Sequence, residues 1–220
     1  MTTPPPAAGL RERKKQATRA ALSGAALRLA VERGPDHVRV EDIAEAAGVS
    51  PRTYNNYFAS REQAIVSAVT ADREARIASA VAARPAGTRL ADAVTDSVVE
   101  QYTNTDEREH RALLLITTRT ALRDAFLDTT ADIEAPLTAA LTERLGDASP
   151  HTARVLAASV GAAVRIALEA WLRPTGNTDA TGTVGATGLL VPSGSLPDQL
   201  RAVLAPLAPA FDAAERRPQP

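Results

Sequence analysis

The chain has no cysteine among its 220 residues. Without a thiol it can form no disulfide framework, no thiolate metal site and no cysteine nucleophile. It also has no apolar run approaching the roughly 18 residues of a membrane-spanning helix. The N-terminal stretch MTTPPPAAGLRERKK lacks the apolar core of a secretory signal. We therefore expect a cytoplasmic protein without a membrane partner.

Aromatic residues are scarce: they make up 3% of the chain, whereas hydrophobic residues make up 45%. The core must consist mainly of Ala, Leu and Val. This composition favours closely packed helices over a sheet, which would use more aromatic and β-branched residues. At this length the chain can form one or two domains with a sizeable core.

The net charge of −1 hides an asymmetry along the chain. Residues 1–67 hold ten Lys or Arg and seven Asp or Glu, whereas residues 68–220 hold fifteen and nineteen. The first segment therefore carries +3 and the remainder −4. A basic patch is what phosphate binding requires, although a solvated basic tail has the same composition.

Residues 40–61 have the pattern of two short helices joined by a tight turn. Ile43, Ala46 and Ala47 place a small apolar face on the first helix. Gly48 can adopt the left-handed conformation that ends a helix. Ser50 is suited to cap the second helix, over residues 51–58, and a proline at its first position sacrifices no needed N–H. The pattern predicts a helix-turn-helix.

The second helix presents side chains that a solvated helix does not need. Arg52, Thr53, Asn55 and Asn56 are polar groups that can hydrogen-bond base edges or phosphates in a major groove. The simpler interpretation of any one of them is an exposed polar residue on a short helix. Taken together they indicate DNA recognition.

This part of the chain contains, in order, Asp42-Ile43-Ala44, Ala47-Gly48-Val49-Ser50, Tyr54-Asn55-Asn56-Tyr57-Phe58 and Ser60-Arg61-Glu62. The ordered set closely resembles the DNA-binding domain of TetR-family transcriptional regulators, from about Arg13 to Val69. The resemblance implies an all-α protein with an N-terminal three-helix helix-turn-helix domain and a C-terminal helical domain for ligand binding and dimerisation. We expect no enzyme, but a repressor that binds a palindromic operator as a homodimer and is released by a small molecule.

The expected DNA contacts combine the helix pattern with this resemblance. Arg39 replaces the Thr usual in the family; it cannot accept a capping bond, but can still reach a phosphate. Arg61 stands where the family usually has a Lys near the DNA backbone. The full set of expected contacts is Lys14, Lys15, Arg39, Ser50, Arg52, Thr53, Tyr54, Asn55, Asn56, Tyr57 and Arg61.

The predicted organisation is a disordered tail over 1–9, the helix-turn-helix domain over 10–60, a linking helix over 61–84 and a C-terminal helical domain over 85–216. Ser60 and Gln63 form a capping box at the start of the linking helix, which should run unbroken to about Ala83. Further helices are expected over 88–102, 106–118, 120–145 with a kink or a break at Pro136, 150–172, and 196–216 interrupted by Pro206 and Pro209. The long loop over 174–195 is Gly/Thr-rich and is predicted to be flexible.

The C-terminal helices contain residues that we expect to form a dimer interface and an effector pocket. Ala157, Ala158, Gly161 and Ala162 permit close approach of a partner helix, although they could equally face the protein's own core. Expected ligand-lining residues are Tyr102, Leu114, Thr118, Arg119, Phe126 and Trp171. Residues 111–116 and 121–123 are similar to a subset of TetR-like regulators that includes responders to acyl-type ligands, so an acyl-type effector is one candidate.

No catalytic constellation or cofactor motif is visible. Glu107 and His110 could be metal ligands, but they lie at i, i+3 without a second pair, so a solvated helix start is the simpler interpretation. The glycines at 182, 185 and 188 match no phosphate-binding fingerprint. The main alternative is a DNA-binding dimer with no effector, whose C-terminal helices serve dimerisation or a protein partner. An enzyme on a helical scaffold would need titratable groups within mutual reach.

Overall fold

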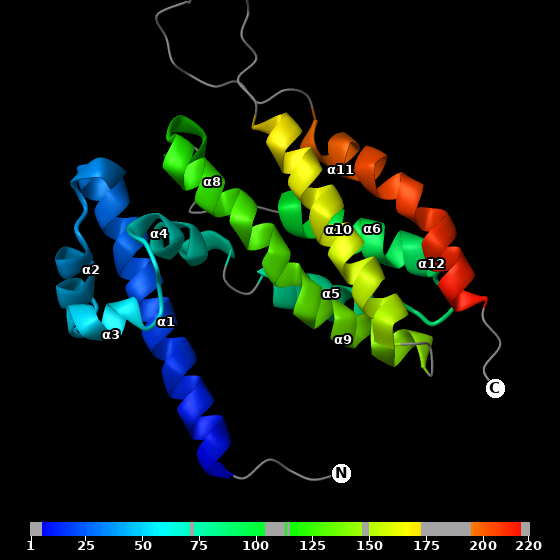
Figure 1. Ribbon diagram of the computed structural model, residues 1–220, viewed down its shortest axis with the longest axis horizontal. Coiled ribbons are helices and arrows are strands. Elements are labelled where there is room, and N and C mark those ends of the chain that lie inside the picture. The colour runs from blue at the N-terminus through cyan, green and yellow to red at the C-terminus, as the bar shows by residue number, and fades with distance from the viewer. Residues whose placement is uncertain are drawn as a thin grey trace, which may run out of the picture. The chain divides into compact units, whose positions relative to one another are not determined.

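The computed structural model describes residues 6–70, 73–103, 113, 115–146, 150–172 and 195–216. Within these ranges the chain forms α-helices and short 3-10 helices and no strand, which confirms the predicted all-α fold (Figure 1). The chain divides into two compact units. The first comprises Met1–Ala71 and Ala112–Ala125, and the second comprises Asp72–Arg111 and Phe126–Pro220.

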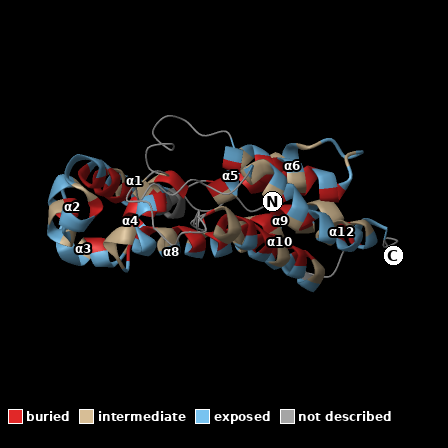
Figure 2. Cartoon of the chain, turned by 90° about the horizontal axis from the view of Figure 1, so that it is seen from above, coloured by how far each residue is buried: buried red, intermediate tan, exposed pale blue. Residues whose placement is uncertain are grey.

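The first unit is built on one long helix, α1 (Pro6–Arg33). Helix α4 (Arg61–Thr70) packs along α1, and α2 (Val40–Ala46) packs against it as well. The short α3 (Pro51–Asn55) packs on α2. The apolar sides of these helices are buried, as the red segments of α1 and α4 show (Figure 2). This core holds α3 in a fixed orientation on the domain.

Two glycines end the first two helices of this unit. Gly34 has φ 82° and precedes the 3-10 helix η1 (Pro35–His37), and Gly48 has φ 69° in the turn between α2 and α3. Side chains are strained in this region of φ, so glycine is the residue that permits both turns. The buried face of α2 consists of Ile43 and Ala44, whereas Ala46 is exposed. The expected apolar face was therefore misplaced by part of a turn.

Helix α1 begins at Pro6, four residues before the predicted start. The predicted linking helix over 60–83 is helical in α4, which ends at Thr70, and in α5 (Arg73–Ala83), while residues 71 and 72 lie outside the described residues. The two helices belong to different units.

The second unit is arranged around α10 (Pro150–Trp171), which packs on α9 (Glu134–Leu145) and α11 (Leu196–Leu204). Helices α5 and α6 (Leu90–Thr103) pack on each other, and α12 (Ala208–Glu215) packs on α6. The buried stripe of α10 includes Ala153, Leu156, Val160, Val164 and Ala167, whereas Trp171 is half-buried.

The helix predicted over 120–145 does break, but the break lies before Pro136 and not at it. The chain forms α8 (Thr120–Asp128), then the 3-10 helix η2 (Thr129–Ile133), and Pro136 lies in the first turn of α9, where a missing N–H costs no helical bond. The break arises earlier because the hydroxyls of Thr129 and Thr130 donate to carbonyls three residues back, each at 2.7 Å.

The interruption predicted in the last helix is confirmed. Helix α11 ends at Leu204, the 3-10 helix η3 (Ala205–Leu207) follows, and α12 begins at Ala208. Most of the helix predicted over 106–118, and the predicted loop over 174–194, lie outside the described residues. In the part of the chain that is described, no helix is both long and apolar enough to cross a bilayer.

Candidate DNA-binding site

Helix α3 starts at a side-chain cap. The Ser50 hydroxyl accepts a hydrogen bond from the Thr53 N–H (3.1 Å), and the two hydroxyls of Ser50 and Thr53 lie 2.9 Å apart. The predicted cap is confirmed. Because both hydroxyls are engaged in capping, their first role is to fix the start of α3.

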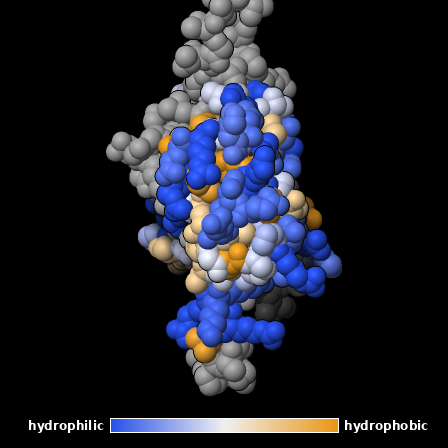
Figure 3. All heavy atoms as spheres, turned by 90° about the vertical axis from the view of Figure 1, so that its left-hand side faces the viewer, coloured by the Kyte–Doolittle hydropathy of each residue, from blue (hydrophilic) through white to orange (hydrophobic). Residues whose placement is uncertain are grey.

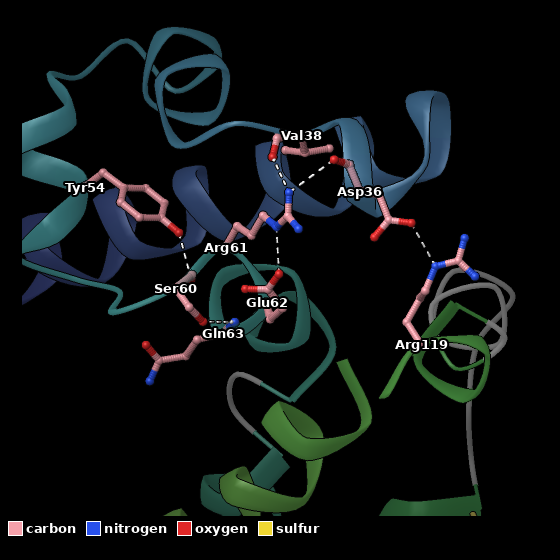
Figure 4. Close-up of polar contacts among 8 residues, drawn as sticks. All are labelled: Asp36, Val38, Tyr54, Ser60, Arg61, Glu62, Gln63 and Arg119. Carbon is pink, nitrogen blue, oxygen red and sulfur yellow. Dashed lines mark hydrogen bonds and ion pairs between the residues drawn. The ribbon is translucent and has the colours of Figure 1, made fainter. Parts of the chain in front are cut away.

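Two aromatic residues fasten the other end of this segment to the domain. Tyr54 and Phe58 are 1% and 2% exposed, with ring centroids 5.8 Å apart. The Arg19 guanidinium of α1 lies over the Phe58 ring at 4.8 Å. The Tyr54 hydroxyl donates to the Ser60 carbonyl at 2.8 Å (Figure 4). Burial, and then the charge of Glu62, raise the pKa of Tyr54 to about 12.

The structure therefore contradicts Tyr54 as a DNA contact. Its side chain spans from the core to the backbone of Ser60 and has no exposed surface to offer a duplex. The residue sets the position of α3 instead, by joining it to the start of α4. Phe58 also packs inside.

The outward edge of α3 carries the polar residues that the sequence singled out. Arg52, Asn55 and Asn56 are exposed, and Thr53 and Tyr57 are half-buried. The face that includes α2 and α3 is mostly hydrophilic (Figure 3). A guanidinium and two carboxamides on one short helix supply the donors and acceptors that base edges in a major groove can match.

The Arg61 side chain forms hydrogen bonds within the protein, contrary to its expected role at the DNA backbone. Its Nη1 donates to the carbonyls of Asp36 and Val38, both at 3.2 Å, and its Nε donates to the Glu62 carboxylate at 2.6 Å (Figure 4). A guanidinium has a fixed fork of donors, and three of its hydrogen bonds here are intramolecular. Arg61 thus clamps the turn before α2 to the start of α4.

Arg39 is exposed at the N-terminus of α2 and makes no side-chain capping bond, as expected. The Asp42 carboxylate instead accepts a hydrogen bond from the backbone N–H of Arg39 (3.1 Å). The Arg39 side chain is therefore not needed for the helix start. Exposed basic residues of α1 include Lys14 and Lys15.

The predicted capping box at the start of α4 is present with one shift. The Ser60 hydroxyl accepts the Gln63 N–H (3.1 Å), while the Gln63 carboxamide accepts the N–H of Ala59 (2.8 Å), one residue before Ser60. These bonds fix the segment between α3 and α4, and with it the orientation of the exposed edge.

Residues 23–68 match the family model described as "Bacterial regulatory proteins, tetR family". These residues of the chain form a TetR-family DNA-binding domain. A curated relative, the HTH-type transcriptional regulator TcmR of Streptomyces glaucescens, is 46% identical over 79 residues. That alignment covers 36% of this chain and 34% of TcmR, so the chain matches about a third of the length of this TetR-type relative.

Two solved structures are also similar to this chain. A candidate TetR-family transcriptional regulator from Rhodococcus sp. has a TM-score of 0.44 at 20% identity, covering 89% of this chain and 99% of the other. A tetR-family transcriptional regulator from Streptomyces coelicolor has a TM-score of 0.42 at 18% identity, covering 92% and 88%.

The residues predicted to line an effector pocket separate into two groups. Tyr102 and Phe126 are buried in the second unit, 8% and 2% exposed, and both lie against one guanidinium. Thr118 and Arg119 are exposed in the first unit, where Arg119 Nε contacts the Asp36 carboxylate at 3.0 Å (Figure 4). Their place in an effector pocket stays a prediction. Trp171 is half-buried at the end of α10, and the Leu114 side chain lies outside the described residues.

Sequence reasoning missed the guanidinium that brings the two rings together. It belongs to Arg73, which is 2% exposed and lies 4.6 Å from the Tyr102 ring centroid and 5.8 Å from that of Phe126. The signal was available: Arg73 precedes Ile77 and Val81 at spacings of four and eight, so it occupies the buried stripe of α5. No group of three or more metal-ligating side chains occurs within the described ranges.

The neighbouring Glu74 should make stability depend on pH. Burial raises its pKa from 4.5 to about 7, against the opposing attraction of Arg73. The folded state then binds the proton more tightly than the unfolded state, so stability falls as pH rises from about 4.5 to about 7 and levels off above. We expect Glu74→Gln to remove this slope and to stabilise the protein at pH 8 by on the order of 2 kcal/mol.

Guanidinium unfolding between pH 4.5 and 8 measures this effect. Glu143→Gln is the matched control, since Glu143 is exposed on α9 and should leave the slope in place. A Glu74→Gln protein with the wild-type pH dependence would contradict the assignment.

Proposed function

We propose that this TetR-family regulator is a homodimeric repressor that binds a palindromic operator and is released by a small-molecule effector. The observation that carries the proposal is the exposed edge of α3 at Arg52, Asn55 and Asn56, held by buried Tyr54 and Phe58. A rigid helix with outward carboxamides is suited to direct readout. In a two-fold symmetric dimer, two such helices would enter successive major grooves about 34–36 Å apart.

Tyr57 should bind phosphate through its hydroxyl, because it is half-buried beside this edge and no hydrogen bond among the described residues engages its hydroxyl. Tyr57→Phe is then expected to weaken binding to all DNA sequences alike, by roughly tenfold. Fluorescence anisotropy with cognate and scrambled duplexes measures both affinities.

Tyr54→Phe is the matched control, since it removes a hydroxyl that bonds only within the protein. It should lower stability by about 1 kcal/mol and leave the pattern of DNA contacts unchanged. A Tyr57→Phe effect confined to one operator position would contradict the phosphate role.

An exposed apolar stripe on α10 supports a second copy of the chain as partner. Val155 and Ile166 are 63% and 58% exposed, and the exposed Ala158 and Ala162 lie between them. Ala157 and Gly161, also expected at an interface, face their own unit: a Cβ on Gly161 would lie 3.1 Å from the Thr130 carbonyl oxygen. Of the four small residues expected at the interface, only Ala158 and Ala162 therefore face outward.

A groove continues this apolar surface. It has a volume of about 390 Å³ and lies between α10 and α12, lined by His151, Thr152, Val155, Leu156, Ala210, Ala213 and Ala214. Exposed apolar side chains beside a hollow of small residues suit a self-complementary helical interface, in which the same patch meets itself across a two-fold axis.

Ala162→Arg is expected to convert the dimer to a monomer, because each two-fold contact would bring two unpaired charges into an apolar interface. Sedimentation velocity at micromolar concentration measures the change. The control is Ala82→Arg, on the exposed side of α5. If Ala162→Arg stays dimeric while wild type is a dimer, the interface lies elsewhere.

Effector binding in the second unit would shift the dimer between arrangements with different spacing of the recognition helices. Helix α8 contains the boundary between units at residues 125 and 126, and the Arg119–Asp36 contact lies directly before it. We propose this segment as a route of coupling in addition to the linking helix predicted over 60–83. The test is release of bound DNA by fractionated cell metabolites; a complex that no fraction releases would favour the effector-free alternative.

A further inference from the structure

The second unit contains a buried cation with an open donor. Arg73 is the first residue of α5 and is 2% exposed, and its Nε–H has no hydrogen-bond partner. Its guanidinium lies against the rings of Tyr102 of α6 and Phe126 of α8. Contact with aromatic faces stabilises a cation, and Tyr102 also hydrogen-bonds the guanidinium, but the Nε–H remains without a partner.

The neighbouring acidic groups neutralise this cation only in part. Burial raises the pKa of Tyr102 to about 12, and the attraction of Arg73 only partly opposes that, so the phenol remains neutral at pH 7. Glu74 has its pKa raised to about 7, again chiefly by burial, so about half of it is protonated there. Among the described residues no carboxylate forms an ion pair with Arg73. A buried charge without an anion is unfavourable.

We propose that Arg73 anchors a binding site for an organic anion, a carboxylate carried on an apolar body, with Tyr102 and Phe126 forming its apolar wall. The inference rests on the proposed effector response and names the chemical class of the effector. Three elements of the unit contribute one side chain each. A planar guanidinium with a free Nε–H matches a carboxylate oxygen, and the two rings exclude water around the pair.

The test compares acids with their neutral amides on the full-length protein. Octanoate is paired with octanamide and benzoate with benzamide, so that each pair differs in charge but not in shape. Isothermal titration calorimetry gives the affinities, and the ¹⁵N–¹H resonance of Arg73 Nε reports the site itself. We expect at least one acid to bind about tenfold or more tightly than its amide and to move that resonance.

Arg73→Met should abolish the preference for acids. It is expected to fold, because it replaces an unpaired buried charge by an apolar side chain. Should it not fold, Arg73→Gln serves instead, since it keeps a polar side chain but loses the charge. Arg76→Met is the control on the same helix and should keep the preference, because Arg76 is exposed.

Equal affinities of acids and amides for wild type would overturn the proposal, as would a preference retained by the Arg73 variant. DNA binding is measured on the same preparations. If DNA binding is intact but no acid is preferred over its amide, the anion site is refuted and the proposed function is not. Loss of DNA binding by every preparation, wild type included, removes the proposed function.

Discussion

Replacing Arg52, Asn55 and Asn56 together by alanine should abolish sequence-specific DNA binding while leaving the fold intact. All three side chains are exposed on α3, so their removal creates no cavity. Each well-placed contact between such a side chain and a base edge contributes roughly 1–3 kcal/mol of discrimination. The triple variant should therefore lose at least about a hundredfold in affinity for cognate DNA.

Fluorescence anisotropy at physiological salt measures the affinities for the cognate and for an unrelated duplex. Because the loss of Arg52 removes one positive charge, Arg201→Ala on the exposed side of α11 is the charge-matched control. The control should keep its preference for the cognate duplex. A triple variant that still discriminates between the two duplexes would show that α3 does not read bases.

Phe58→Ala should have the largest effect on stability. The ring is 2% exposed, lies beside Tyr54 and is covered by the Arg19 guanidinium. Truncating a buried phenylalanine costs about 3–5 kcal/mol, a large share of the 5–15 kcal/mol that typically stabilises a domain. We expect the first unit to be largely unfolded and DNA binding to be lost with it.

Hydrogen exchange at the amides of buried Ile43 and Ala44 reports the first unit directly, alongside circular dichroism. Phe58→Leu retains most of the apolar volume and should keep both protection and DNA binding. If Phe58→Ala lowered stability by less than about 1 kcal/mol, the aromatic pair would not be what positions α3.

The helix-turn-helix was predictable because its signals are local. Gly48, Ser50 and Pro51 each act within one turn of the chain, and the structure places them as expected. The errors arose where a side chain bonds across the fold. Nothing in the spacing of Tyr54 or Arg61 reveals that one bonds the carbonyl of Ser60 and the other those of Asp36 and Val38.

Helix continuity was the other weak point. Pro136 drew attention to the wrong position, because a proline in a first turn is harmless and the paired hydroxyls of Thr129 and Thr130 break the helix earlier. Arg73 was overlooked since a basic residue at a helix start is ordinarily solvated. Its spacing to Ile77 and Val81 was the available indication of burial.

The most direct measurement is selection of bound duplexes from random DNA by the full-length protein, with the Arg52, Asn55 and Asn56 triple variant in parallel. Wild type should enrich two inverted half-sites whose centres are about one helical turn, or a multiple of it, apart, and the triple variant should enrich none. Enrichment of the same sequences by both proteins, or of none by wild type, would contradict the claim that the outward edge of α3 reads DNA.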